Sequence, residues 1–375
     1  MKPIYLDCNA TTPIEKEVTE TVIFYLEKEY GNSGSRTHVY GNNANQAVEA
    51  SRKHIAELVS SEKDEIIFTS GATESNNLAI LGLKNYGFDT KRNHIVSTTI
   101  EHKAVLEPLE HLEKNGFEVT LVDVGKSGRL DPSQVESAVR DNTLLVSVMH
   151  ANNETGILQP IDELANMLYD SDILLHVDAA QGYGKEIEPL QNQGVDLISV
   201  SGHKIYGPKG IGALVRRRRK ESRIDPLFLG GGQERGLRPG TLPVHLIAGL
   251  GKASELAKQN HLERKKINEN FKIDLLQAFE TLNPTIFGDQ NYCLANVVSL
   301  SFGAFDSEAI MLLLKDEVSI SNGSACTSSN YEPSHVLTAI GASEDEAEGV
   351  TRWSWCHLTV QPDWDKIVET IEKLK

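Results

Sequence analysis

A lysine and a cysteine in polar, glycine-rich segments are the residues of this chain best suited to covalent chemistry. Lys204 lies in "SVSGHKIYGPKG", directly after an apolar run and beside Ser201 and His203. A lysine held at the end of a strand can be desolvated, which lowers its pKa and lets its amine form a Schiff base. Cys326 lies in "SNGSACTSSN", which offers no apolar face for a sulfur to pack against, so we expect a reactive thiol. Taken alone, a surface lysine and an incidental thiol are the ordinary alternatives.

Three further polar positions follow apolar runs. In "FTSGATESNNLAI", the backbone N–H groups near Ala72 and Thr73 and the Thr73 hydroxyl form an anion cup suited to a phosphate, although a helix N-cap explains Thr73 equally well. Asp178 follows the apolar run "ILLHV" and needs a strong partner, for which a protonated pyridine nitrogen is one candidate, and an N-cap or an internal ion pair is the alternative. His102, in "TTIEHKAV", could stack on a ring or carry protons, or could be a satisfied core histidine.

These positions together point to one cofactor. A phosphate cup, an acid for a pyridinium nitrogen and a Schiff-base lysine are the three groups that pyridoxal phosphate requires, and they occur here in that order along the chain. The sequence therefore predicts a pyridoxal phosphate site.

The elements that must position these groups are short β-branched runs, mostly separated by helix-length stretches. This alternation predicts an α/β fold with a mostly parallel sheet and helices on both faces. Ligands of such sheets bind beyond the carboxyl ends of the strands, where the polar positions lie. The predicted strands cover 64–70, 94–99, 118–124, 143–150, 173–179, 196–201 and 210–217.

The pattern changes after about residue 250. A long charged helical segment leads to a strand at 296–302 and a helix near 307–315, which predicts a smaller α+β domain. We expect a large cofactor-binding domain over 12–255, and a small domain over 1–11 and 256–375 that carries the Cys326 segment.

Composition narrows the class of protein. The formal net charge of −16 argues against direct binding to nucleic acid or to an anionic membrane surface. No apolar segment is long enough to span a bilayer, and the N-terminal sequence lacks an export signal, so we expect a cytoplasmic protein. The one basic run, Arg216 to Lys220, is either a solvated helix start or a docking patch.

The cysteines indicate neither a disulfide framework nor a metal site. All four lie far apart, without the spacing of zinc ligands. We expect Cys293 and Cys356 to be packed residues, and leave open a direct role for Cys8 in "LDCNATTP".

Eight motifs resemble the cysteine desulfurases of the NifS/IscS type, in the class V aminotransferase group. They are "YLDCNATTP", "FTSGATESNNLAI", "TIEHKAV", "HANNETG", "HVDAAQ", "SGHKIYGPKGIG", "RPGTLPV" and "NGSACTSSNYEPSHVL", which run from Tyr5 to the last third of the chain. The resemblance extends to about residue 352. It implies the fold type I architecture of pyridoxal phosphate enzymes and a homodimer with the cofactor at its interface.

The resemblance also implies roles for individual residues. Lys204 would hold the cofactor covalently, Asp178 would pair with its pyridine nitrogen, and His102 would stack on the ring and assist proton transfer. Arg352 would bind the substrate carboxylate through both ends of its guanidinium. The remaining contacts would come from Gln181 to the phenolic oxygen, Asn153 to cofactor and substrate, Ala72, Thr73, Ser201 and His203 to the phosphate, and Thr241 from the other subunit.

The implied reaction converts L-cysteine to L-alanine, with the sulfur held as a persulfide on Cys326 and passed to an acceptor protein. "YLDCNATTPIEKEV" and "YGNSGSRTHVYG" resemble the DndA and SspA types, which supply sulfur for DNA phosphorothioate modification. "RWSWCHLTV" departs from the "RFSLGRFT" of general iron–sulfur desulfurases. The alternatives are a general sulfur donor, a selenocysteine lyase, a class V transaminase, and an inactive sulfur carrier.

Overall fold

A seven-stranded sheet forms the centre of the computed structural model, which describes residues 2–303, 305–322 and 334–373. Within this sheet β8 runs antiparallel to both of its neighbours, and the other adjacent pairs are parallel. The α/β fold with a mostly parallel sheet is therefore confirmed. In spatial order the strands are β2 (Ile66–Thr69), β8 (Gly212–Arg216), β7 (Leu197–Ser201), β6 (Leu174–Asp178), β5 (Thr143–Met149), β3 (His94–Thr98) and β4 (Glu118–Val122).

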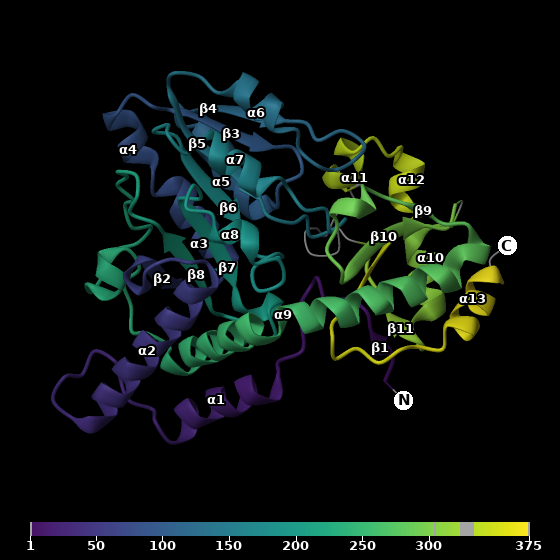
Figure 1. Cartoon of the computed structure of the whole chain (residues 1–375), viewed down its shortest axis with the longest axis horizontal. Helices are drawn as coiled ribbons and strands as arrows, with labels where there is room; N and C mark the ends of the chain where they lie inside the picture. The colour runs from purple at the N-terminus through teal and green to yellow at the C-terminus, as the bar shows by residue number, and fades with distance from the viewer. Residues whose placement is uncertain (1, 304, 323–333, 374–375) are drawn as a thin grey trace.

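Helices cover both faces of this sheet because alternate strand residues bury their side chains on opposite faces (Figure 1). Leu145 and Leu174 pack under α3 (Ala72–Leu81) and α5 (Lys103–Glu113), near α4 (Lys84–Asp89). The adjacent residues Val146 and Leu175 face the opposite layer. That layer contains α1 (Lys16–Glu27), α2 (Val39–Leu58), α6 (Pro132–Ala138), α7 (Ile161–Met167) and α8 (Glu188–Gln191).

A second, smaller body is built on the antiparallel sheet β12-β10-β9, with a short parallel pair beside it. Its core centres on the fully buried Trp353 and Trp355, which pack near Phe279 and Phe271. Its elements are β9 (Thr285–Ile286), β10 (Val297–Ser301), α10 (Ser307–Leu314), α11 (His335–Ala339), α12 (Glu344–Glu348), β12 (Val350–Ser354) and α13 (Trp364–Glu372), with β1 (Ile4–Tyr5) paired to β11 (Val318–Ser319).

The 36-residue helix α9 (Val244–Phe279) runs from one body into the other (Figure 1). Its first half, including Ile247 and Leu250, is buried in the core of the large body. Its last turns bury Leu275 and Phe279 in the core of the small one. Within the part of the chain that the structure describes, neither α9 nor any other helix has the length and apolar character needed to cross a membrane.

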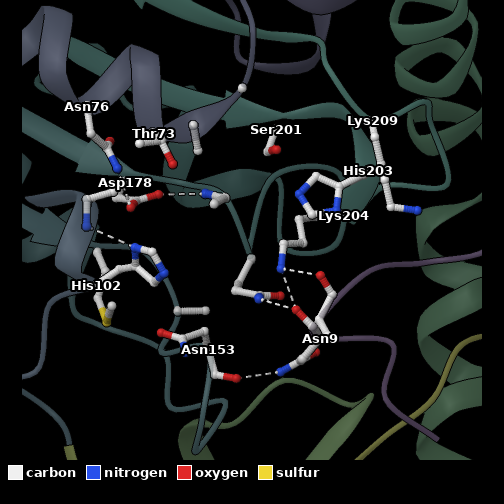
Figure 2. Close-up of a pocket in the computed structure, with 18 of the residues that line it drawn as sticks. Asn9, Thr73, Asn76, His102, Asn153, Asp178, Ser201, His203, Lys204 and Lys209 are labelled. Carbon is white, nitrogen blue, oxygen red and sulfur yellow. Dashed lines mark hydrogen bonds between the residues drawn. The ribbon is translucent and has the colours of Figure 1, made fainter. Parts of the chain in front are cut away.

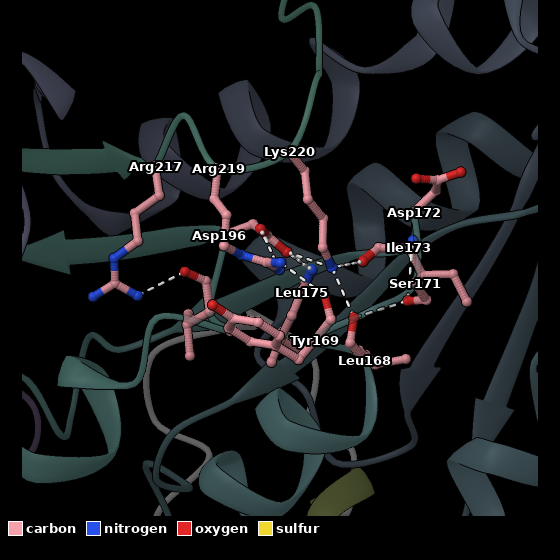
Figure 3. Close-up of polar contacts among 12 residues, drawn as sticks. Leu168, Tyr169, Ser171, Asp172, Ile173, Leu175, Asp196, Arg217, Arg219 and Lys220 are labelled. Carbon is pink, nitrogen blue, oxygen red and sulfur yellow. Dashed lines mark hydrogen bonds and ion pairs between the residues drawn. The ribbon is translucent and has the colours of Figure 1, made fainter.

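The basic run is part of the fold (Figure 3). Arg219 and Lys220 both form ion pairs with the buried Asp196. Arg217 is 4% exposed. Its guanidinium donates hydrogen bonds to the backbone carbonyls of Val59, Leu190, Asn192 and Val195. Arg218 has the more exposed side chain, and the run does not begin a helix, so the interpretation as a solvated helix start is wrong.

Candidate active site

Parallel strands end at one edge of the sheet, and a cavity of about 470 Å³ opens there (Figure 2). Strands β2, β5, β6 and β7, together with the loops that follow them, provide most of its wall. Among the described residues of the small body, Arg352 of β12 lines the cavity. Of the residues predicted from the sequence, Ala72, Thr73, His102, Asn153, Asp178, Gln181, Ser201, His203, Lys204 and Arg352 line this cavity.

Lys204 reaches the cavity from the short turn that follows β7. Its Nζ donates hydrogen bonds to the carbonyl oxygens of Asn9 and Ala10, the latter at 2.9 Å. The turn is fixed to the N-terminal segment, because both the N–H and the hydroxyl of Thr12 donate to the carbonyl of His203 at 3.0 Å. The amine is therefore held at the cavity wall rather than in bulk solvent.

Asp178 lies across the cavity from Lys204, at the carboxyl end of β6 (Figure 2). Its carboxylate is buried and accepts hydrogen bonds from Asn76 Nδ2 at 2.7 Å and from the Ala180 N–H at 2.9 Å. Two donors fix the orientation of this carboxylate, which places an anion where a protonated ring nitrogen could meet it.

The N-terminus of α3 forms the anion-binding end of the cavity. Gly71 precedes the helix with φ = 154°, a value that favours glycine, and no side chain caps the first N–H groups. The hydroxyls of Thr73 and Ser201 lie around this end. The carboxylate of Glu74 is held away by Arg238 at 2.9 Å, so the uncapped helix start presents its partial positive charge to the cavity.

The two histidines of the cavity are favoured in their neutral forms. Burial lowers the pKa of His102, against the opposing effect of Asp178. Its Nδ1 accepts a hydrogen bond from the Ala104 N–H at 3.0 Å, so the neutral ring carries its proton on Nε2. Burial, reinforced by Lys204, lowers the pKa of His203 to about 4.

Arg352, on β12 of the small body, also lines the cavity. It is 2% exposed in β12, donates from Nη1 to the Asn153 carbonyl at 3.0 Å, and pairs through Nη2 with Asp7 at 2.6 Å. Its buried Nε has no hydrogen-bond partner among the described residues. This guanidinium can therefore still receive an anionic group from the cavity.

The lining residues that were not predicted include Asn9, Asn76 and Lys209. Asn9 accepts hydrogen bonds at its carbonyl from Lys204 and from Gln181 Nε2, and its own Nδ2 donates to the Asn153 carbonyl at 3.1 Å. It lies in the quoted "LDCNATTP", and Lys209 lies in "SGHKIYGPKGIG", so the signal was present without an assigned role. Asn76 likewise lies in the quoted "FTSGATESNNLAI", one turn into the helix after Thr73, without an assigned role.

Other predicted residues lie elsewhere. Thr241 is exposed and lines a separate hollow of about 200 Å³ beside Arg52 and Glu234. Cys326 lies outside the described residues. Cys8 and Cys356 are buried behind the cavity wall, and Cys293 is partly buried against Lys272.

Comparison with known sequences and structures agrees with this geometry. A sequence model of the aminotransferase class-V family matches residues 4–367. The chain belongs to the class-V aminotransferase family. It is 43% identical to the cysteine desulfurase IscS of Anaeromyxobacter sp. (strain Fw109-5), with all of this chain and 93% of that protein aligned.

Two solved structures are similar over nearly the whole chain. DndA from Streptomyces lividans is 46% identical with a TM-score of 0.83, covering 92% of this chain and 98% of DndA. The structure of SspA in complex with cysteine is 36% identical with a TM-score of 0.83, covering 95% of this chain and all of SspA.

Pyridoxal phosphate is the cofactor of this family, and the residues present fit it. The uncapped start of α3 suits its phosphate, and the anchored Asp178 suits its ring nitrogen. Asn76 Oδ1 and Gln181 Oε1 are buried cavity atoms without partners among the described residues. Burying such atoms unpaired is unfavourable, so they indicate a polar ligand.

Proposed function

We propose that this protein is a homodimeric cysteine desulfurase that converts L-cysteine to L-alanine and holds the sulfur as a persulfide on Cys326. The observation that carries the proposal is one cavity that combines Lys204, Asp178 and the anion-binding start of α3 with an arginine from the small body. Its cations suit both a phosphate and a substrate carboxylate. The identity to cysteine desulfurases over the whole chain supports the choice of substrate.

Each cavity residue has a task in this reaction. Asp178 and the start of α3 would hold the cofactor, and Arg352 would bind the carboxylate of the amino acid. Bound here, pyridoxal phosphate would supply an electron sink for the bond that breaks at Cα. Lys204 Nζ would accept the Cα proton as general base, and His102 Nε2 would hold or return a proton nearby.

Sulfur transfer then needs a thiolate, which we assign to Cys326. Its Sγ would attack the sulfur of bound L-cysteine, so that an S–S bond forms as the Cβ–S bond breaks. The electron pair of the broken bond goes to the carbon fragment, which regains protons and leaves as L-alanine. The terminal sulfur remains on Cys326 for an acceptor protein.

Mass spectrometry of Cys326 after incubation with L-cysteine tests this proposal. We expect one added sulfur atom on Cys326, with L-alanine formed in equal amount. Cys326→Ala should abolish turnover but retain cofactor absorbance, Lys204→Ala should lose covalent attachment of the cofactor, and Cys293→Ala should match the parent. Cysteine turnover that survives in Cys326→Ala would refute the mechanism and favour a selenocysteine lyase or a transaminase.

The homodimer is supported by exposed apolar side chains on the large body. Leu229 is 89% exposed and Tyr30 is 67% exposed. The hollow beside Thr241 lies between their two segments, because it is lined by both 32–34 and 233–234. Thr241 would reach the phosphate of the partner subunit from there. Sedimentation should give a dimer, and Leu229→Asp should weaken it.

We further propose that the acceptor belongs to DNA phosphorothioation. The motif resemblance and the identity to DndA support this choice, while the similar identity to IscS favours a general iron–sulfur donor as the second candidate. Deleting the gene should remove phosphorothioate linkages from DNA and leave iron–sulfur enzymes active. The reverse outcome would favour the second candidate.

A further inference from the structure

Two buried thiols lie directly behind the cavity wall and have no task in the proposed reaction. Cys8 is 1% and Cys356 is 2% exposed, and they share one buried cluster with Tyr206. Their backbones run side by side, because the Cys8 N–H donates to the Ser354 carbonyl at 2.9 Å. The two side chains pack together within this cluster. The fold therefore brings together two cysteines that are 348 positions apart in the sequence.

A lysine amine accompanies this pair. Lys185 Nζ is buried and has no hydrogen-bond partner among the described residues. Burial lowers its pKa to about 8, and the two sulfurs act in the opposite direction, so the amine is mostly protonated at pH 7. A small cavity of about 20 Å³ is lined by Lys185 and by Tyr206, which packs with the two thiols, and it has room for roughly one water-sized molecule.

The two thiols differ in acidity. Their mutual interaction raises the pKa of the Cys8 thiol and lowers the pKa of Cys356. Cys356 is therefore the thiol that releases its proton more readily. A more acidic thiol packed with a second thiol beside an amine has the components of an attacking and a resolving cysteine.

Both ends of this pair are tied to the catalytic cavity. On one side of Cys8, Asp7 forms the ion pair with Arg352, and on the other, the Asn9 carbonyl accepts from Lys204. Cys356 follows the strand that carries Arg352. A change in the separation of the two sulfurs would therefore move groups that line the cavity.

We propose that Cys8 and Cys356 are a redox modification site that reacts with hydrogen peroxide, closes to a disulfide and weakens amino-acid binding in the cavity. Cys356 Sγ, having released its proton to solvent, attacks the peroxide, so that an S–O bond forms, the O–O bond breaks, and one oxygen leaves as water with a proton from solvent. Cys8 Sγ then displaces the second oxygen, which keeps the hydrogen it had in the peroxide, takes the Cys8 proton and leaves as water. The two sulfurs lose two electrons and the peroxide gains them. Closure to an S–S bond of about 2.05 Å brings the two sulfurs from packing contact to bonding distance, which draws the two segments together.

The test uses the holoenzyme of Cys293→Ser/Cys326→Ser, in which Cys8 and Cys356 are the two remaining cysteines. After hydrogen peroxide and removal of excess, we expect no free thiol, a mass lower by two hydrogen atoms, and a linked peptide pair that dithiothreitol separates. Binding of L-alanine, which cannot reduce a disulfide, is followed by cofactor absorbance. We expect it to weaken by about tenfold on oxidation, because displacements near 1 Å can cost this much or more, and to recover on reduction.

Matched variants complete the test. Adding Cys8→Ser should leave Cys356 oxidised without a cross-link and L-alanine binding nearly unchanged, and Lys185→Met should slow disulfide formation. Oxidation without a linked pair, or a linked pair with unchanged binding, would overturn the proposal. The binding readout rests on the proposed function. Failure of the reduced protein to respond to L-alanine would count against that function, whereas a missing disulfide would count against this site.

Discussion

Arg352 offers the sharpest test of how the cavity selects its substrate. Its side chain is 3% exposed, with Nη1 on the Asn153 carbonyl and Nη2 on Asp7. These contacts fix the guanidinium plane, and the buried Nε remains without a partner among the described residues. We therefore predict that a carboxylate binds through Nε together with a neighbouring Nη atom, as two charge-assisted hydrogen bonds.

The size of the effect follows from the number of hydrogen bonds that the substitution removes. A hydrogen bond to a charged group contributes about 1.5 kcal/mol or more, so two contribute about 3 kcal/mol. Arg352→Gln should raise KM for L-cysteine about 100-fold, since each 1.4 kcal/mol is about tenfold. Arg352→Lys keeps the charge but has one point of attachment, so it should raise KM about tenfold. In both, kcat should change by less than about threefold, because the carboxylate is bound equally in the ground and transition states.

The assay is steady-state formation of L-alanine over a range of L-cysteine concentrations. Arg129→Lys is the control, because Arg129 does not line the cavity. Cofactor absorbance and thermal unfolding show that the variants retain their fold. If Arg352→Lys lowered kcat about tenfold and left KM unchanged, the carboxylate would be bound elsewhere and the reasoning would be wrong.

Three further predictions concern stability and cofactor binding. Arg217→Met should lower the free energy of unfolding by about 3 to 5 kcal/mol in urea titrations, because it leaves buried carbonyls unpaired. Arg218→Met, at an exposed position, should lower it by about 0.5 kcal/mol. Equal losses in the two variants would contradict the structure. Burial raises the pKa of Glu101 from 4.5 to about 8, so the folded state binds the extra proton and the contribution of this group to stability falls as the pH rises between those values. Glu101→Gln should remove this loss, so the free energy of unfolding of the variant, relative to that of the parent, should be higher at pH 8 than at pH 5. An equal difference between variant and parent at both pH values would contradict the raised pKa of Glu101. Gly71→Ala should weaken cofactor binding about tenfold in absorbance titrations of the apoprotein, because alanine is strained at φ = 154°, while Gly232→Ala, at φ = −72° in open space, should not.

The sheet and the polar groups at its edge could be predicted because their signals are local. The strand predicted at 173–179 is observed at Leu174–Asp178, and the strand predicted at 196–201 is observed at Leu197–Ser201. Parallel strands bring such positions to one edge without knowledge of any distant contact. The lining of the cavity by Lys204 and His102 follows from the same rule.

Features that depend on distant pairing had no such signal. Asn9 enters the cavity because β1 pairs with β11 and Asp7 bridges to Ser354, more than 300 positions away. Arg217 is buried because carbonyls from separate loops converge on its guanidinium, and the sequence shows only a run of positive charge. Tertiary contacts determine burial in both cases, and local composition does not encode them.

The pairing of the N-terminal segment has a consequence for synthesis on the ribosome. The strands that pair with residues 4–8 lie at 318–319 and 354, and Arg352 pairs with Asp7. These contacts can form only after residues 318–354 have left the ribosome, although Asn9 can meet Gln181 and Lys204 earlier. A nascent chain can therefore form most of the large sheet before the arginine side of the cavity exists. The complete wall around a ligand has to await the emergence of Arg352.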